Sequence, residues 1–268
     1  MKNKNILVIA ASSQIGLEII KPLLASGYNV YVTSRSGVEL EHSNLFKFHL
    51  DICDENSFIK LKDKIKDVEF CSIVNCAGMV ISSPVEFLSD SELQKQLDVV
   101  LFGLLKIIRH FARKIIKGGK LINLSSMASY GVFPFISPYC LSKSAADILL
   151  RSFSNETGIK YVSVRPGAIR TKFWTESIKI NEENFKNFTG EYEKCGRFLL
   201  ANANKNAEKS TPPEVVGKAV VKIIKDKNPK CVVNVGYDAK ITAFASRFIP
   251  EKTMNKIIKF ALSIRSKK

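Results

Sequence analysis

A serine, a tyrosine and a lysine in the middle of the chain have the types and the spacing of an acid–base site. Tyr139 follows Ser126 by thirteen residues, and Lys143 follows Tyr139 by four. Residues four apart on a helix lie on one face, so we expect the ammonium beside the phenol. A positive charge there favours the tyrosinate and lowers the tyrosine pKa from its usual value of about 10. Tyr139 then gives or takes a proton, while Ser126 hydrogen-bonds a carbonyl or alcohol oxygen.

Three other short segments follow apolar runs and contain residues suited to a nucleotide. Residues 10–16 (AASSQIG) lead into a helical pattern, residues 75–78 are NCAG, and residues 166–171 are PGAIRT. A tight strand-to-helix turn presents backbone N–H groups and the positive end of a helix to a phosphate. Only Gly16 remains of the glycine pattern typical of dinucleotide sites. By itself, the first turn therefore fits an ordinary strand-to-helix connection equally well.

These segments lie at the ends of predicted strands. Apolar, β-branched runs alternate with helix-length segments along the chain. The seven predicted strands are residues 6–11, 30–33, 45–50, 72–74, 120–124, 161–164 and 231–235. The alternation predicts an α/β fold, a doubly wound parallel sheet of about seven strands with helices on both faces, similar to a Rossmann fold. Ligands of such sheets bind beyond the carboxyl ends of the strands, where these segments converge.

The pattern predicts a single dinucleotide-binding and catalytic domain over residues 1–268, because no linker or repeat divides it. Residues 172–213 interrupt the rhythm with a polar stretch rich in lysine and asparagine. We expect this insertion to be a substrate-binding lid rather than a spacer. Its apolar residues predict an apolar substrate, such as a lipid-like, sterol, retinoid or acyl ketone. They are Phe173, Trp174, Phe185, Phe188, Tyr192, Phe198 and Leu199.

Residues 122–126 (INLSS) and 137–143 (SPYCLSK) resemble the active-site segment of the short-chain dehydrogenase/reductase family. The resemblance runs from residue 6 to about residue 235. It implies a single-domain Rossmann-type oxidoreductase acting on CH–OH groups with NAD(P), in which Ser126, Tyr139 and Lys143 are catalytic. It also implies a dimer or tetramer formed through the helices around residues 98–116 and 137–157.

Two departures from the family pattern bear on activity. The TGxxxGxG turn becomes IAASSQIG, so Ala10 replaces a glycine, and Gln14 stands where the chain approaches the pyrophosphate. Val100 stands in place of the family's catalytic asparagine, whose amide helps to hold a water in a proton relay to the lysine. These changes leave an alternative open, in which the protein is a catalytically weak or inactive NADP-binding sensor or scaffold. The intact Ser126, Tyr139 and Lys143 favour the enzyme.

The end of the second predicted strand indicates the cofactor. Sites that select NAD place an acid there against the ribose hydroxyls, whereas residues 33–36 are TSRS. Arg35 can pair with a 2′-phosphate, so we predict NADP(H) over NAD(H), unless the arginine is only solvated. The residues expected to bind the nucleotide are Ala10, Ser12, Ser13, Gln14, Ile15, Gly16, Arg35, Asp51, Ile52, Asn75, Ala77, Gly78, Tyr139, Lys143, Pro166, Gly167, Ile169 and Thr171.

Composition narrows the classes of function. The 268 residues are 46% hydrophobic and 25% charged, as in a globular protein, and no apolar run is long enough to span a bilayer. The net charge of +16 would suit nucleic acid or an anionic membrane. No basic run is interleaved with aromatic residues, so we predict no nucleic-acid partner. Six scattered cysteines without a CxxC pair indicate free thiols in a cytoplasmic protein, and the histidine spacing predicts no metal site.

Residues 240–268 form a basic C-terminal extension. Apolar residues repeat at helical spacing from residue 251, after Pro250, and lysines fill the positions between them. Two interpretations are open. The helix binds the surface of an anionic membrane peripherally, or its apolar face covers the substrate pocket or a partner subunit.

Overall fold

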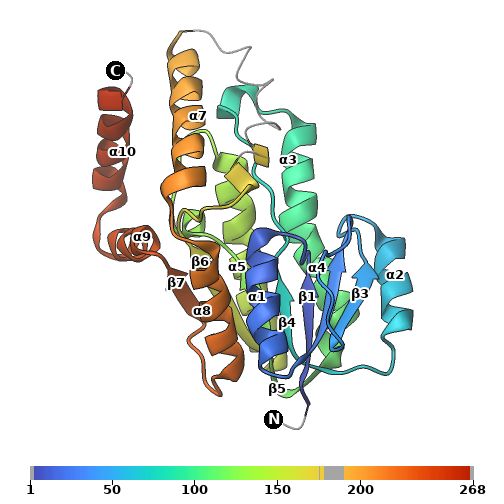
Figure 1. Cartoon of the computed structure of the whole chain (residues 1–268). Coiled ribbons are helices and arrows are strands. Elements are labelled where there is room, and N and C mark those ends of the chain that lie inside the picture. The colour runs from blue at the N-terminus through green and yellow to red at the C-terminus, as the bar shows by residue number, and fades with distance from the viewer. Residues whose placement is uncertain (1–2, 175, 178–189, 266–268) are drawn as a thin grey trace.

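The computed structural model describes residues 3–174, 176–177 and 190–265, and its centre is a seven-stranded sheet (Figure 1). Every neighbouring pair of strands is parallel, and the strand order is β3-β2-β1-β4-β5-β6-β7. This confirms the predicted fold class. The strands are β1 (Asn5–Ile9), β2 (Asn29–Ser34), β3 (Leu45–His49), β4 (Phe70–Asn75), β5 (Ile115–Leu124), β6 (Lys160–Pro166) and β7 (Val232–Val235).

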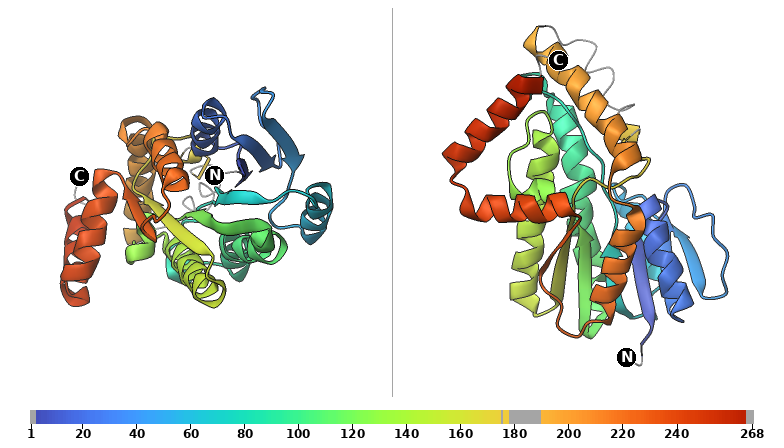
Figure 2. Two further views of the ribbon diagram at one scale, coloured as in Figure 1. Left: turned by 90° about the horizontal axis from the view of Figure 1, so that it is seen from below. Right: turned by 60° about the vertical axis from the view of Figure 1, so that its left-hand side comes forward.

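Helices cover both faces of the sheet (Figures 1 and 2). On one face pack α1 (Gln14–Ala25) and α8 (Pro213–Lys225), and on the other α2 (Glu55–Lys64), α4 (Gly103–Phe111) and α5 (Ser137–Thr157). Alternate residues of β1 feed the two cores: Ile6 and Val8 enter the first, and Leu7 and Ile9 the second. Each face is therefore sealed by apolar contacts, which leaves the carboxyl edge of the sheet for ligands.

A π-helical turn lies inside the helical segment between β4 and β5. After α3 (Asp90–Leu97), η2 (Asp98–Phe102) forms the π turn and leads into α4. Val100 lies in this turn, is 3% exposed and belongs to the hydrophobic core with Leu7 and Leu104. The residue that replaces the family's asparagine therefore contributes to packing.

The insertion at residues 172–213 contains a long helix, α7 (Glu191–Lys209). The segments at the two ends of the insertion are hydrogen-bonded to each other. Ile169 and Thr211 form a parallel bridge, and Arg170 N donates to Thr211 O at 2.9 Å. Phe185 and Phe188 lie outside the described residues, as do the side chains of Phe198 and Leu199. The lid role of this insertion stays a prediction.

After β7 the chain forms α9 (Tyr237–Phe248) and α10 (Glu251–Arg265). The second helix begins directly after Pro250, as the sequence predicts. Figures 1 and 2 show α9 next to the end of the sheet and α10 extending away from it.

Candidate active site

Ser126, Tyr139 and Lys143 line one cavity of about 710 Å³ at the carboxyl edge of the sheet. Ser126 follows the end of β5 by two residues and caps η4 (Met127–Tyr130), where its Oγ accepts from Ala128 N at 3.1 Å. Tyr139 and Lys143 lie on the first two turns of α5, whose second residue is Pro138. Lys143 Nζ donates to Leu124 O at 2.8 Å and lies 5.7 Å from the centroid of the Tyr139 ring. The structure therefore brings the three side chains together.

Burial decides the charge of these groups. It raises the pKa of Tyr139 to about 12, although a hydrogen bond with the Ser126 side chain opposes the rise. Burial also lowers the pKa of Lys143 to about 8, against the attraction of the Asp147 carboxylate. The expectation that the pKa of Tyr139 is lowered is wrong for this structure, because burial raises it, while the Lys143 ammonium donates to Leu124 O and lies 5.7 Å from the centroid of the ring. Tyr139 is thus protonated at neutral pH and suited to donate a proton.

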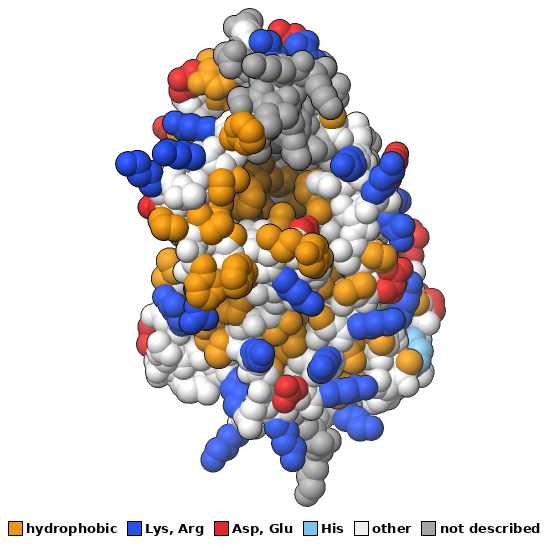
Figure 3. Space-filling view, turned by 90° about the vertical axis from the view of Figure 1, so that its left-hand side faces the viewer, with side chains coloured by type: hydrophobic (Ala, Val, Ile, Leu, Met, Phe, Trp, Pro, Cys, Tyr) orange, Lys and Arg blue, Asp and Glu red, His pale blue; other side chains and the backbone are white. Residues whose placement is uncertain are grey.

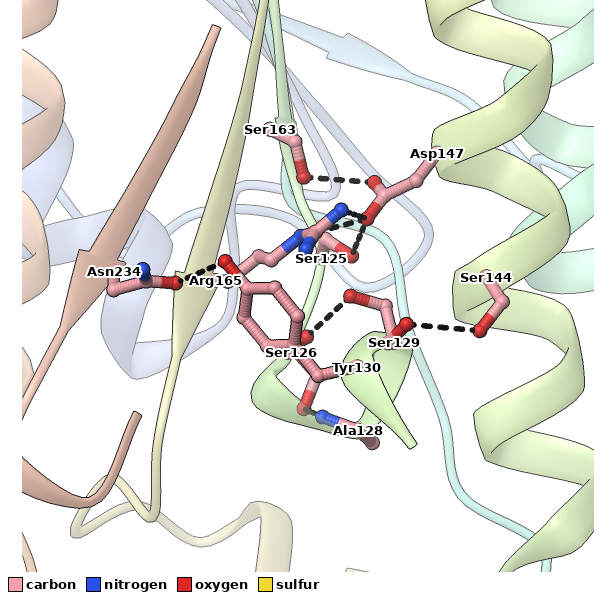
Figure 4. A network of polar contacts seen from close by, with 10 residues as sticks. All are labelled: Ser125, Ser126, Ala128, Ser129, Tyr130, Ser144, Asp147, Ser163, Arg165 and Asn234. Atoms are coloured by element: carbon pink, nitrogen blue, oxygen red, sulfur yellow. Dashed lines mark hydrogen bonds and ion pairs between the residues drawn. The ribbon is translucent and has the colours of Figure 1, made fainter. Parts of the chain in front are cut away.

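A buried carboxylate supports the site from behind (Figure 4). Asp147 lies one helical turn after Lys143 and is 8% exposed. It accepts hydrogen bonds from Ser125 Oγ at 3.0 Å, Ser163 Oγ at 2.7 Å and Arg165 Nε at 2.9 Å. Asp147 therefore ties α5 to the ends of β5 and β6 while it stabilises the positive charge of Lys143.

Arg165 extends this network to η4. Its guanidinium forms an ion pair with Asp147 at 2.9 Å and lies 4.1 Å from the centroid of the Tyr130 ring. The Tyr130 hydroxyl donates to Asn234 Oδ1 on β7 at 2.9 Å. The segment that follows Ser126 is thereby fixed to β6 and β7 (Figure 4). The sequence gives no local signal for these partners, because they are far apart along the chain.

A buried side-chain amide, that of Gln96, connects the segment after β4 to α5. Gln96 is fully buried; its Oε1 accepts from Ile81 N at 2.9 Å, and its Nε2 donates to Ser142 Oγ at 3.0 Å. Ser142 Oγ in turn donates to Tyr139 O at 2.9 Å. Gln96 thus holds the backbone of Tyr139 against the wall of the cavity.

The turn between β1 and α1 has the form of a phosphate site despite its missing glycines. Ala10 adopts a left-handed conformation with φ of 56°. A Cβ on Gly16 would lie 2.5 Å from Ala11 O, so only glycine fits there. Ser13 caps α1 by accepting from Gly16 N at 3.0 Å, and the helix N-terminus faces the cavity. Its first-turn N–H groups and its dipole suit a pyrophosphate, so the residues present fit a dinucleotide.

Most of the predicted nucleotide contacts line the cavity together with Ser126, Tyr139 and Lys143. These are Ser12, Ser13, Gln14, Ile15, Ala77, Gly78, Pro166, Gly167, Ile169 and Thr171. Gln14 Oε1 accepts from Lys172 N at 2.6 Å, which links the phosphate turn to the start of the insertion. A Cβ on Gly78 would lie 3.4 Å from Lys143 Nζ, so the segment after β4 passes directly beside the lysine.

Six predicted contacts do not line this cavity: Ala10, Gly16, Arg35, Asp51, Ile52 and Asn75. Ala10 and Gly16 determine the backbone shape of the turn between β1 and α1. The Asn75 side chain bonds Asn123 Oδ1 at 2.8 Å and Ala77 N at 3.1 Å, so it fixes the strand ends. Asp51 Oδ1 accepts a hydrogen bond from Cys53 N at 2.9 Å. The Ile52 side chain packs against Gly103, where an added Cβ would lie only 2.7 Å from Ile52 Cγ1. Direct contact of these residues with a nucleotide stays a prediction.

Arg35 lies in an adjoining hollow of about 230 Å³, lined also by Lys47 and His49. Gly37 and Val38 line both this hollow and the main cavity. Sequence reasoning missed Glu39, which lines the main cavity on the same loop. Its position shortly after the end of β2 could have drawn attention to it, because such loops lie at the ligand edge.

The far side of the cavity is apolar. Its wall includes Phe133, Ile136, Phe173, Trp174 and Leu200. Trp174 Nε1 donates to Ile169 O at 2.6 Å, so the indole is fixed to the segment after β6. Tyr192 instead packs edge-on against Phe87 and Phe135, beside the wall.

Comparison with known proteins decides the family. Residues 4–182 match the family model described as short chain dehydrogenase. The chain belongs to this family. This short-chain dehydrogenase is 30% identical to a 3-amino-tetrahydro-pyrrolizinone reductase of Xenorhabdus hominickii, and the match covers 90% of the chain and 89% of that protein. It is 26% identical to a 3-ketodihydrosphingosine reductase of Bacteroides thetaiotaomicron, over 99% of the chain and 100% of the relative.

Solved structures agree on the fold of this short-chain dehydrogenase. A short chain dehydrogenase from Burkholderia cenocepacia in complex with NADP aligns with a TM-score of 0.75, 19% identity and coverage of 96% of this chain and 97% of that one. One from Francisella tularensis aligns with a TM-score of 0.75, 20% identity and coverage of 90% and 99%.

Three findings concern metal ions, membranes and cysteines in this short-chain dehydrogenase. Within residues 3–174, 176–177 and 190–265, no group of histidine, cysteine and acidic side chains is arranged to bind a metal ion. Over the same residues, no helix has the length and apolar character that crossing a bilayer requires. Cys53, Cys71, Cys76, Cys140 and Cys231 are free thiols.

Proposed function

We propose that the protein is an NADP(H)-dependent oxidoreductase that interconverts an apolar ketone or aldehyde with its alcohol. The observation that carries this proposal is the convergence of Ser126, Tyr139 and Lys143 on a cavity that also adjoins a phosphate-binding turn. Bound nicotinamide supplies or accepts the hydride. Ser126 hydrogen-bonds the substrate oxygen, and Tyr139 donates its proton to that oxygen during reduction. The Lys143 ammonium stabilises the tyrosinate that remains.

NADP(H) is the proposed cofactor because three basic side chains surround the hollow after β2. Arg35, Lys47 and His49 line it, and Arg35 can pair with a 2′-phosphate. Relatives support the same choice: a 1-acyldihydroxyacetone phosphate reductase of Saccharomyces cerevisiae, 25% identical over 94% of this chain and 90% of that protein, is named NADPH-dependent.

A lipid-like carbonyl compound is the proposed substrate class. The aromatic and aliphatic side chains beyond the catalytic residues favour an acyl chain or a ring over a polar metabolite. Two relatives are named as reductases of 3-ketodihydrosphingosine and of 1-acyldihydroxyacetone phosphate, and both names describe lipids.

A panel of carbonyl compounds tests this proposal. NADPH oxidation is followed with ketones of equal head group and increasing acyl length, and then with NADH at the same concentrations. We expect kcat/KM to rise with chain length and to be higher with NADPH than with NADH. The sensor or scaffold alternative predicts tight NADPH binding without turnover of any member, and that result would replace the enzyme proposal.

A further inference from the structure

The C-terminal helices expose an aromatic and aliphatic surface to solvent. Tyr237, Ile241, Phe244 and Phe248 of α9 are exposed, at 80%, 49%, 65% and 61%. Their spacing of three and four residues places them on one face of the helix. Ile257 and Phe260 of α10 add 48% and 66% exposure. We call these six residues the C-terminal patch.

Basic residues accompany this patch. Between residues 237 and 260 the chain carries Lys240, Arg247, Lys252, Lys256 and Lys259, against two acids, Asp238 and Glu251. Lys240, Lys252, Lys256 and Lys259 are exposed. Asp238 is engaged at the base of α9, where it accepts from Ala168 N at 2.6 Å. The exposed charge of α9 and α10 is therefore mainly positive.

The helix α9, which carries four of the patch residues, contacts residues that line the substrate cavity. Thr242 of α9 contacts Met127 Sδ at 3.7 Å, and Asp238 holds Ala168; both Met127 and Ala168 line the cavity. Figure 3 views this side of the molecule and shows hydrophobic side chains around a hollow, with lysine and arginine side chains beside them.

We propose that the C-terminal patch docks on an anionic lipid bilayer, with the aromatic residues in the headgroup region and the lysines on the lipid phosphates. Exposed aromatic and aliphatic residues on a basic amphipathic helix suit the membrane interface. A second copy of the chain suits the patch less well. A two-fold contact brings the same surface of both copies together, and here it would bring lysines against lysines. Docking places the cavity beside the bilayer, where apolar compounds partition.

The test is sedimentation of the full-length protein with vesicles, without nucleotide or substrate, so that its result does not depend on the proposed reaction. Vesicles of phosphatidylcholine alone are compared with vesicles that also contain phosphatidylserine. We expect binding to the anionic vesicles at low ionic strength, at least tenfold weaker binding to the neutral ones, and release by high salt.

Two variants separate the apolar and the charged contributions to vesicle binding. Each should weaken binding at least tenfold. One is the double change Phe244→Ser and Phe248→Ser, and the other is the triple change Lys252→Glu, Lys256→Glu and Lys259→Glu. The matched controls lie on other elements: Ile59→Ser with Val85→Ser for exposed apolar side chains, and Lys60→Glu, Lys62→Glu and Lys64→Glu on α2 for charge. The controls should bind as the unchanged protein does. Unaltered thermal unfolding shows that each variant is folded.

Three results would overturn the inference. The first is no binding to anionic vesicles at low ionic strength. The second is an equal loss of binding in the α2 charge variant, which would mean that net charge alone drives association. The third is a change of oligomeric state in the phenylalanine variant while the unchanged protein binds no vesicles. That result would assign the patch to a second copy of the chain.

Discussion

At the scale of single residues, Lys143 combines two opposing requirements. Its ammonium is 3% exposed and has Leu124 O as a hydrogen-bond acceptor, so burial lowers its pKa from 10.5 to about 8. The proposed reaction needs the positive charge, whereas the fold is destabilised by it. Catalytic residues commonly carry such a cost to stability.

Lys143→Met is expected to raise the free energy of unfolding at pH 7. A pKa near 8 against 10.5 in the unfolded chain corresponds to roughly 3 kcal/mol of destabilisation while the lysine is charged. The lost bond to Leu124 O offsets part of the gain, leaving about 1–3 kcal/mol. Because the unfolded chain binds more protons between about pH 8 and 10.5, the unchanged protein gains stability across that window. The advantage of the variant should therefore shrink towards pH 10.

Urea unfolding at pH 7 and pH 10 measures this difference. Lys60→Met, at an exposed position on α2, is the control and should change stability by less than about 0.5 kcal/mol. A Lys143→Met protein less stable than the unchanged protein at pH 7 would contradict the charge assignment.

Asp147 is expected to act through Lys143. Its carboxylate raises the pKa of the lysine, so Asp147→Asn should lower that pKa further. Loss of activity on the alkaline side of the pH–rate profile of carbonyl reduction should then begin at lower pH. Ser163→Ala removes one hydrogen bond to Asp147 and keeps its charge, so its profile should match that of the unchanged protein. Equal profiles for Asp147→Asn and the unchanged protein would limit Asp147 to a structural role.

At the scale of elements, the turn between β1 and α1 contains local strain. Ala10 has φ of 56°, a conformation that costs an L-residue about 1–2 kcal/mol. Ala10→Gly should stabilise the protein by about 0.5–1 kcal/mol, since greater freedom of the unfolded glycine offsets part of the relief. Ala11→Gly, next to it at a buried position of negative φ, should instead destabilise it. Thermal unfolding of both variants measures whether each substitution raises or lowers stability. Destabilisation by Ala10→Gly would show that the backbone at Ala10 is not strained.

Local patterns predicted the elements well, because each strand and its neighbouring helix bury an apolar face of their own. All seven predicted strands are present, but β5 begins at Ile115 rather than residue 120. Its first residues include Lys117, Gly118 and Gly119, which carry little strand signal. The π turn at η2 and the helix α7 within the insertion were not predicted. The π turn packs against α5, which is distant in the sequence, and hydrophobic periodicity does not report such contacts.

The site was predictable where its residues are close in sequence. Tyr139 and Lys143 are one helical turn apart, and the order of the strands places Ser126 beside them. Asp147 with Arg165, and Gln96 with Ser142, were missed because their partners come from other elements. The pKa of Tyr139 was predicted in the wrong direction, since the charge of Lys143 can be read from the sequence and the depth of burial cannot.

At the scale of the whole molecule, a second exposed apolar surface bears on assembly. Leu141 and Ile148, one face of α5, are 51% and 61% exposed, and Phe102 in the adjacent η2 is 40% exposed. These residues lie on the helices that the family resemblance assigns to a dimer or tetramer. We expect Ile148→Glu to lower the oligomeric state in light scattering at micromolar concentration, and Ile59→Glu on α2 to leave it unchanged. A protein that is monomeric without any substitution would contradict this assignment.

Tyr139 is the proposed proton donor in an NADPH-dependent reduction, and the variant Tyr139→Phe is the direct test of that role. The measurement is turnover of the best ketone of the panel, paired with the dissociation constant of NADPH on the same preparation. Only the phenol hydroxyl is removed, so turnover should fall by at least about a hundredfold while NADPH affinity stays within about threefold. Turnover close to that of the unchanged protein, with NADPH still bound, would show that Tyr139 is not the proton donor.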